Sequence, residues 1–226
     1  MLGFPSVSKD YNATSWEFGQ HEGISRPPIR LCKPFAVRDE LKAEQQISAM
    51  GTIAALRWIN PRMDQKQILL HHFLAALAYR TQKALRGAPP EFASFRAAPK
   101  VRTPHELIRH MDDVLGYSRT FFIGGAYRAP EFPDFRAAIA HFHETLADVA
   151  LQIERGTELR EVTPEILLQG PFSDAMTHAG QIALLRRLAG CAVPPENFVF
   201  ADINVKNLGP DQPLPARPDE VWPEGP

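Results

Sequence analysis

Apolar residues recur along this chain in the three- and four-residue steps of an amphipathic helix, and they do so in four long segments. The spacing predicts helices over about 61–86, 104–122, 134–155 and 174–189. The third helix has the most regular apolar stripe, which consists of Phe135, Ile139, Phe142, Leu146, Val149 and Ile153. Four helices that each have one apolar side predict an all-α fold, a four-helix bundle.

Residues at the helix boundaries support these spans. Thr103-Pro104-His105-Glu106 is a capping box with proline at the first helical position. Asn60-Pro61 predicts a similar start for the first helix. Gly156 ends the third apolar stripe. Ser173 is the expected N-cap of the last helix, and Gly190 suits the position just after its end.

The two ends of the chain differ from this helical part. Residues 1–36 have no sustained period, and 38–58 are helix-like, so we expect an N-terminal extension over 1–60 and the bundle over 61–226. Eight prolines exclude a regular helix in the tail, 191–226. Its apolar residues predict that the tail lies across the bundle surface. Strand-like alternation is confined to 198–203.

Composition narrows the functional classes. The 226 residues are 44% hydrophobic and 23% charged, as in ordinary soluble proteins, and a net charge of −1 argues against binding to nucleic acid or to an anionic membrane. The chain contains neither a spanning apolar run nor a secretory leader pattern. Cys32 and Cys191 lie far apart and form no CxxC, which favours a reduced cytoplasmic protein and leaves a disulfide between them as an alternative.

The last predicted helix carries two polar side chains on its apolar side. Asp174 and His178 lie about 40° apart on the helical wheel, close to the line of Leu185. His110 falls between apolar positions of the second helix. Burial of a carboxylate and imidazoles is costly without a partner, and a metal ion is one such partner. We therefore predict a metal site of His110, Asp174 and His178, suited to zinc, nickel or iron(II), with positions left open for catalysis.

Other interpretations of these residues stay open at this stage. Asp174 follows the expected cap, where the helix dipole favours an acid without any metal. His178 is also compatible with a hydrogen-bonded core histidine and His110 with a boundary residue. Tyr117, two turns after His110, is either a packed core residue or a proton donor. The remaining histidines of the helices are expected at surface, boundary or helix-start positions: His71, His72, His105, His141 and His143.

Three pieces of the chain resemble the DinB-like (damage-inducible) superfamily of metal-binding four-helix bundles. They are Glu106-Leu-Ile-Arg-His110, the run from Thr177 to Gly190, and Glu196-Asn-Phe-Val-Phe-Ala-Asp202 together with Gly209-Pro-Asp-Gln212. The resemblance covers roughly 61–226. It implies a long crossover between the second and third helices, and a homodimer.

The resemblance also implies a divalent metal held by one histidine of the second helix and two of the last. His110 and His178 match this pattern, whereas position 174 holds Asp instead of His. A carboxylate is also a metal ligand, so this departure either changes the metal preference or weakens the site.

The activity implied by the resemblance is a metal-dependent thiol S-transferase, which joins a low-molecular-weight thiol to a small-molecule substrate. Neither cysteine lies in a motif that would make it the nucleophile, so the thiol would be a cosubstrate. The alternatives are a metal-dependent hydrolase that uses a bound water and a non-catalytic, stress-related binding module.

Overall fold

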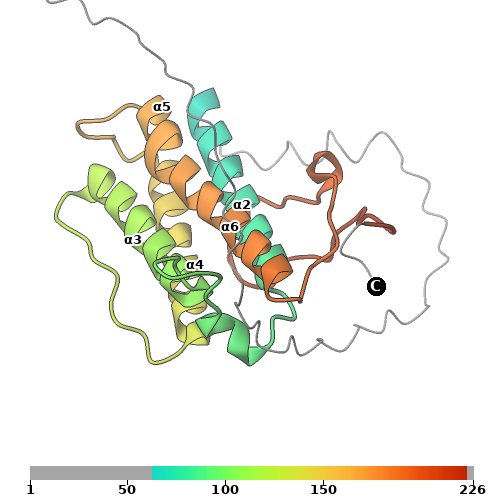
Figure 1. Ribbon diagram of the computed structural model, residues 1–226. Helices are drawn as coiled ribbons and strands as arrows, with labels where there is room; N and C mark the ends of the chain where they lie inside the picture. The colour runs from blue at the N-terminus through green and yellow to red at the C-terminus, as the bar shows by residue number, and fades with distance from the viewer. Residues whose placement is uncertain (1–62, 223–226) are drawn as a thin grey trace, which may run out of the picture.

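The computed structural model describes residues 63–222, and this part of the chain is helical. Its four long helices are α2 (Gln65–Leu85), α3 (Pro104–Ile123), α4 (Phe135–Glu154) and α6 (Ser173–Leu188). Each packs against two others, in the cyclic order α2, α4, α3, α6 (Figure 1). The prediction of an all-α fold is confirmed for the described residues. The extension over 1–60, with its helix-like segment 38–58, lies outside them.

The helix starts follow from side-chain caps. Thr103 Oγ1 accepts from the amide of Glu106 at 3.2 Å, while Glu106 Oε2 accepts from the amide of Thr103 at 2.7 Å, so the predicted capping box is confirmed. The first predicted helix begins at Gln65, later than expected, because Asp64 caps it in the same way with Gln67. The cap expected at Asn60-Pro61 lies outside the described residues.

The start predicted for the last helix is wrong. Ser173 is no N-cap, because the preceding residue is already helical and the Ser173 hydroxyl donates to Leu168 O at 2.5 Å. The helical path begins at α5 (Pro164–Leu167), which Thr163 caps, and continues through one π-helical segment (Leu168–Phe172) into α6. Pro171 has no N–H for an α-helical bond, and the wider π-helical segment accommodates it without a break in the chain.

α3 and α4 run parallel, so the segment between them crosses the length of the helices (Figure 1). Two ion pairs show that the helices run in the same direction. Asp112 of α3 pairs with His141 of α4, and seven residues later in both helices Arg119 pairs with Asp148. Tyr127 fixes the crossing segment by donating to Asp112 Oδ2 at 3.0 Å. This is the kind of crossover that the sequence resemblance implies.

The core lies between the four long helices. The apolar stripe of α4 is buried from Phe142 to Ile153, and Phe135 and Ile139 lie at its rim. Leu77 of α2, Met111 of α3 and Ile182 of α6 meet this stripe in one cluster. His110 comes directly before Met111, and Asp174 and His178 come one to two turns before Ile182, on the two helices that form the α3–α6 contact.

The chain after α6 runs back over α2 and α4. Lys83 Nζ donates to Pro194 O at 2.5 Å, Tyr79 OH to Glu196 Oε1 at 2.7 Å, and His143 Nδ1 to Leu208 O at 2.7 Å. The strand-like interpretation of 198–203 is wrong, because Phe198–Phe200 is a short 3-10 helix. Within residues 63–222, β pairing is limited to one isolated bridge, between Glu196 and Pro218.

Candidate metal centre

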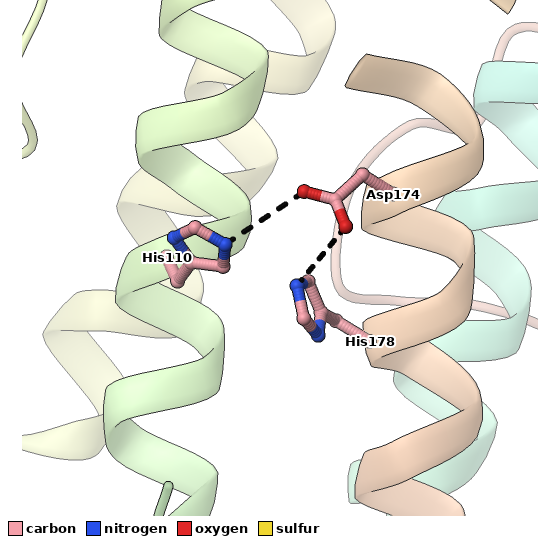
Figure 2. A group of neighbouring side chains, drawn as sticks. All are labelled: His110, Asp174 and His178. Carbon is pink, nitrogen blue, oxygen red and sulfur yellow. Dashed lines mark ion pairs between the residues drawn. The ribbon is translucent and has the colours of Figure 1, made fainter. Parts of the chain in front are cut away.

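One imidazole of α3 and two side chains of α6 point toward one another (Figure 2). His110 Nε2 lies 3.7 Å from Asp174 Oδ2, and His178 Nε2 lies 3.3 Å from Asp174 Oδ1. One ligand atom from each of the three residues lies within 4.8 Å of the other two. The structure therefore brings together the three residues that the sequence singled out.

The spacing of these atoms fits ligands of one ion better than partners of one another. Hydrogen bonds to nitrogen are typically about 2.7–3.2 Å long, and both separations exceed this range. Two ligands that are each about 2.1 Å from a tetrahedral zinc lie roughly 3.4 Å apart. The observed 3.3 and 3.7 Å are close to that edge length.

His178 is oriented as a metal ligand would be. Its Nδ1 lies 2.8 Å from Gln181 Oε1, and because this amide oxygen can only accept, Nδ1 carries the proton. In the neutral form of the ring, Nε2 then holds a lone pair that faces Asp174. That atom is buried and has no hydrogen-bond partner among the described residues. A buried lone pair without a partner is the feature that a metal ion would satisfy.

His110 is suited to ligation by its charge state. Partial burial lowers its pKa, and the positive charge of Arg102 and the second imidazole at His178 lower it further. Asp174 and Asp113 oppose this shift. A lowered pKa favours the neutral imidazole, which is the form that binds a metal.

The exposure of the three side chains differs across the site. His178 is 9% exposed, whereas His110 is 30% and Asp174 47% exposed. The remaining coordination positions would thus open toward solvent.

A separate cavity of about 430 Å³, lined by Gln67 and Phe122 among others, lies near the C-terminal end of α3. Phe122 is twelve residues from His110, about 18 Å along the helix, so this cavity is not part of the site.

The continuous helical path also bears on Asp174. A first-turn acid is favoured where backbone N–H groups end a helix without partners. Here α5 and the π-helical segment precede Asp174, so it does not lie at a free helix start. The helix dipole therefore does not explain why an aspartate occupies position 174.

Tyr117 and His143 do not lie where the sequence predicted. Tyr117 is 56% exposed, so the line from His110 to Tyr117 follows the rim of α3 and not its core. His143, expected at a surface or boundary position, is only 3% exposed. The tail covers it, and its ring bonds Leu208 O through Nδ1 and the amide of Gln82 through Nε2. Burial lowers the pKa of this imidazole.

The other histidines fall at the positions expected of them. His71, His105 and His141 are partly buried and His72 is exposed. His141 has a partner that sequence reasoning missed, because its Nδ1 lies 3.0 Å from Oδ2 of the fully buried Asp112. An acid next to Met111 on an apolar helix face could have signalled this buried pair.

Cys191 is not a free thiol in this structure, so the expectation of a reduced cysteine is wrong at this position. Cys32 lies outside the described residues.

Across residues 63–222, no helix is both long and apolar enough to cross a membrane. Comparison with known proteins found no matching family model, no matching curated protein and no matching solved structure. Membership of the DinB-like superfamily therefore stays a prediction from the sequence.

Proposed function

We propose that this protein binds one divalent metal ion through His110, Asp174 and His178 and uses it in the transfer of a thiol to a small electrophile. The supporting observation is the buried Nε2 of His178, which has no hydrogen-bond partner among the described residues and lies 3.3 Å from Asp174 Oδ1, while Asp174 Oδ2 lies 3.7 Å from His110 Nε2. Two nitrogens and one oxygen suit zinc, nickel or iron(II).

When bound, a divalent ion would lower the pKa of a low-molecular-weight thiol and so supply a thiolate at neutral pH. The thiol proton would pass to solvent water and the thiolate sulfur would attack the electrophilic carbon. The new carbon–sulfur bond would replace the bond to a leaving group, which departs with its electron pair. His178 and His110 would hold the ion from two helices, and Asp174 would hold it on the more exposed side of the site. Tyr117, about 10 Å along α3 from His110, is too distant to protonate a leaving group there.

Metal analysis tests the binding step. The full chain is stripped with a chelator, reloaded separately with zinc, nickel or iron(II), and its metal content is measured. We expect about one ion per chain, and none in His178→Ala. His72→Ala is the matched control, because His72 is an exposed histidine of α2. Stoichiometric metal in His178→Ala would refute the site.

Thermal melting supplies a second readout. A ligand at a hundred times its Kd stabilises the native state by about 2.7 kcal/mol. For a protein of this size, that raises the Tm by roughly 5–11 °C. The wild type and His72→Ala should show this shift, whereas His178→Ala should melt at the same temperature with and without metal.

A turnover assay tests the chemical step. The reloaded protein is given mercaptoethanol and a chromogenic aryl halide, and product formation is compared with and without the thiol. Metal-dependent and thiol-dependent product is expected from the wild type. Product released without thiol would identify a hydrolase, and metal binding without any turnover would favour a non-catalytic binding module.

A further inference from the structure

A small pocket lies on the side of α6 opposite the candidate metal centre. Its volume is about 120 Å³, and it is bounded by α2, α6 and the chain that follows α6. Gly180 lines it and is two residues from His178, which places the two about 200° apart around the helix axis. The pocket is thus separate from the metal ligands.

One wall of this pocket is cationic. Lys83 is 9% exposed, and its ammonium donates to the neutral carbonyl of Pro194. The ion pairs within residues 63–222 do not include Lys83. The nearby carboxylate of Glu196 accepts from Tyr79 OH through both oxygens, at 2.7 and 3.0 Å. A buried ammonium without a counter-ion in contact is costly, and an anion in the pocket would offset that cost.

A second cation stands beside the first. The Arg80 guanidinium carbon lies 3.8 Å from the ring centre of Phe198, and both side chains line the pocket. Arg80 takes part in none of the ion pairs within the described residues. Burial is the main cause that lowers the pKa of Lys83; the negative charges of Glu196 and Asp219 oppose this shift, and the positive charges of Arg187 and Arg86 add to it.

The opposite wall is apolar, and one of its residues is a glycine, which has no side chain to fill the pocket. Ala179, Gly180 and Ala183 of α6 form it. A Cβ built at Gly180 would meet no atom within 4 Å, so close packing does not require glycine there. Glycine also weakens a helix relative to alanine. The absence of a side chain at this position leaves space in the pocket.

We infer that this pocket binds a short organic carboxylate, with its head group between Arg80 and Lys83 and its apolar body against α6. The volume of about 120 Å³ is about four times the ~30 Å³ that a water occupies in the liquid. It is well below the roughly 300–1,000 Å³ of sites for drug-sized ligands. A carboxylic acid of three or four carbons matches both the size and the division between charged and apolar walls.

Titration of the full chain with propionate, at constant ionic strength, tests this inference by calorimetry. We expect saturable binding of one propionate per chain and at least tenfold weaker binding in Lys83→Met. Gly180→Leu, which fills the pocket, should abolish it. Lys66→Met is the matched control, since Lys66 is an exposed lysine of the same helix and should leave the affinity unchanged. Circular dichroism verifies that each variant is folded.

The inference would be overturned by equal binding of the neutral propionamide, by tighter binding of inorganic phosphate than of propionate, or by unchanged affinity in both pocket variants. Carboxylates also bind metal ions directly, so the titration is repeated on metal-free His178→Ala. Retained binding there supports the α2–α6 pocket, and lost binding would assign the carboxylate to the metal centre instead.

Discussion

Replacing Gln181 with leucine removes the hydrogen bond that orients His178, the most buried side chain of the proposed metal site. Gln181 Oε1 accepts from His178 Nδ1 at 2.8 Å, and this contact determines which ring nitrogen carries the proton. In Gln181→Leu the ring loses the partner that holds Nε2 toward Asp174. Removal of a hydrogen-bond partner of a metal-binding histidine typically weakens metal affinity about 10–100-fold, or roughly 1.4–2.7 kcal/mol.

The fold should tolerate this change. Gln181 itself is exposed, so water can accept from His178 Nδ1 once the amide is gone. We expect the metal-free variant to lose less than about 1 kcal/mol of stability, the size of an ordinary solvated hydrogen bond. That corresponds to a fall in Tm of at most about 2–4 °C.

Competition with a chromogenic zinc chelator measures the affinity. Gln181→Glu retains an acceptor and adds negative charge, which strengthens the imidazole as a ligand, so zinc should bind at least as tightly as in the wild type. Gln65→Leu, at an exposed glutamine of α2, should change nothing. A Gln181→Leu affinity within twofold of wild type would show that this bond does not position the ligand. Complete loss of zinc would show that Gln181 is itself a ligand.

Three further changes test the packing that supports the site. Gly116→Ala would place a Cβ 2.0–2.3 Å from ring atoms of Tyr127, so we expect about 1–3 kcal/mol of destabilisation in urea, and unchanged stability would contradict this packing. The pKa of His143 is lowered by burial, so the unfolded state binds more protons below about pH 6.5. Stability should accordingly fall as the pH drops below about 6.5, and His143→Gln should reduce this fall; equal slopes would exclude His143 as a cause. Tyr79→Phe leaves the buried carboxylate of Glu196 without its donor. It should cost about 1.5–3 kcal/mol in the same urea assay, and a loss below about 0.5 kcal/mol would show that this bond contributes little.

Helical periodicity carried most of the information that the sequence holds about this fold. Side chains three or four residues apart lie on one side of a helix, so the apolar stripes predicted where α3, α4 and α6 run. The same rule placed Asp174 and His178 together, because both belong to one helix. Capping depends on contacts within four residues, which explains why the start of α3 at Thr103 was readable from the sequence.

Contacts between distant segments were decided only by the tertiary structure. A helical wheel gives the direction of a side chain around its own axis and not the identity of the neighbouring element. The meeting of His110 with α6, the burial of His143 beneath Leu208, and the exposure of Tyr117 all depend on such neighbours. The start of α6 could not be predicted for a related reason. The π-helical segment that contains Pro171 packs against α3 and α2, and this packing stabilises it. The apolar periodicity of the sequence does not indicate such a segment.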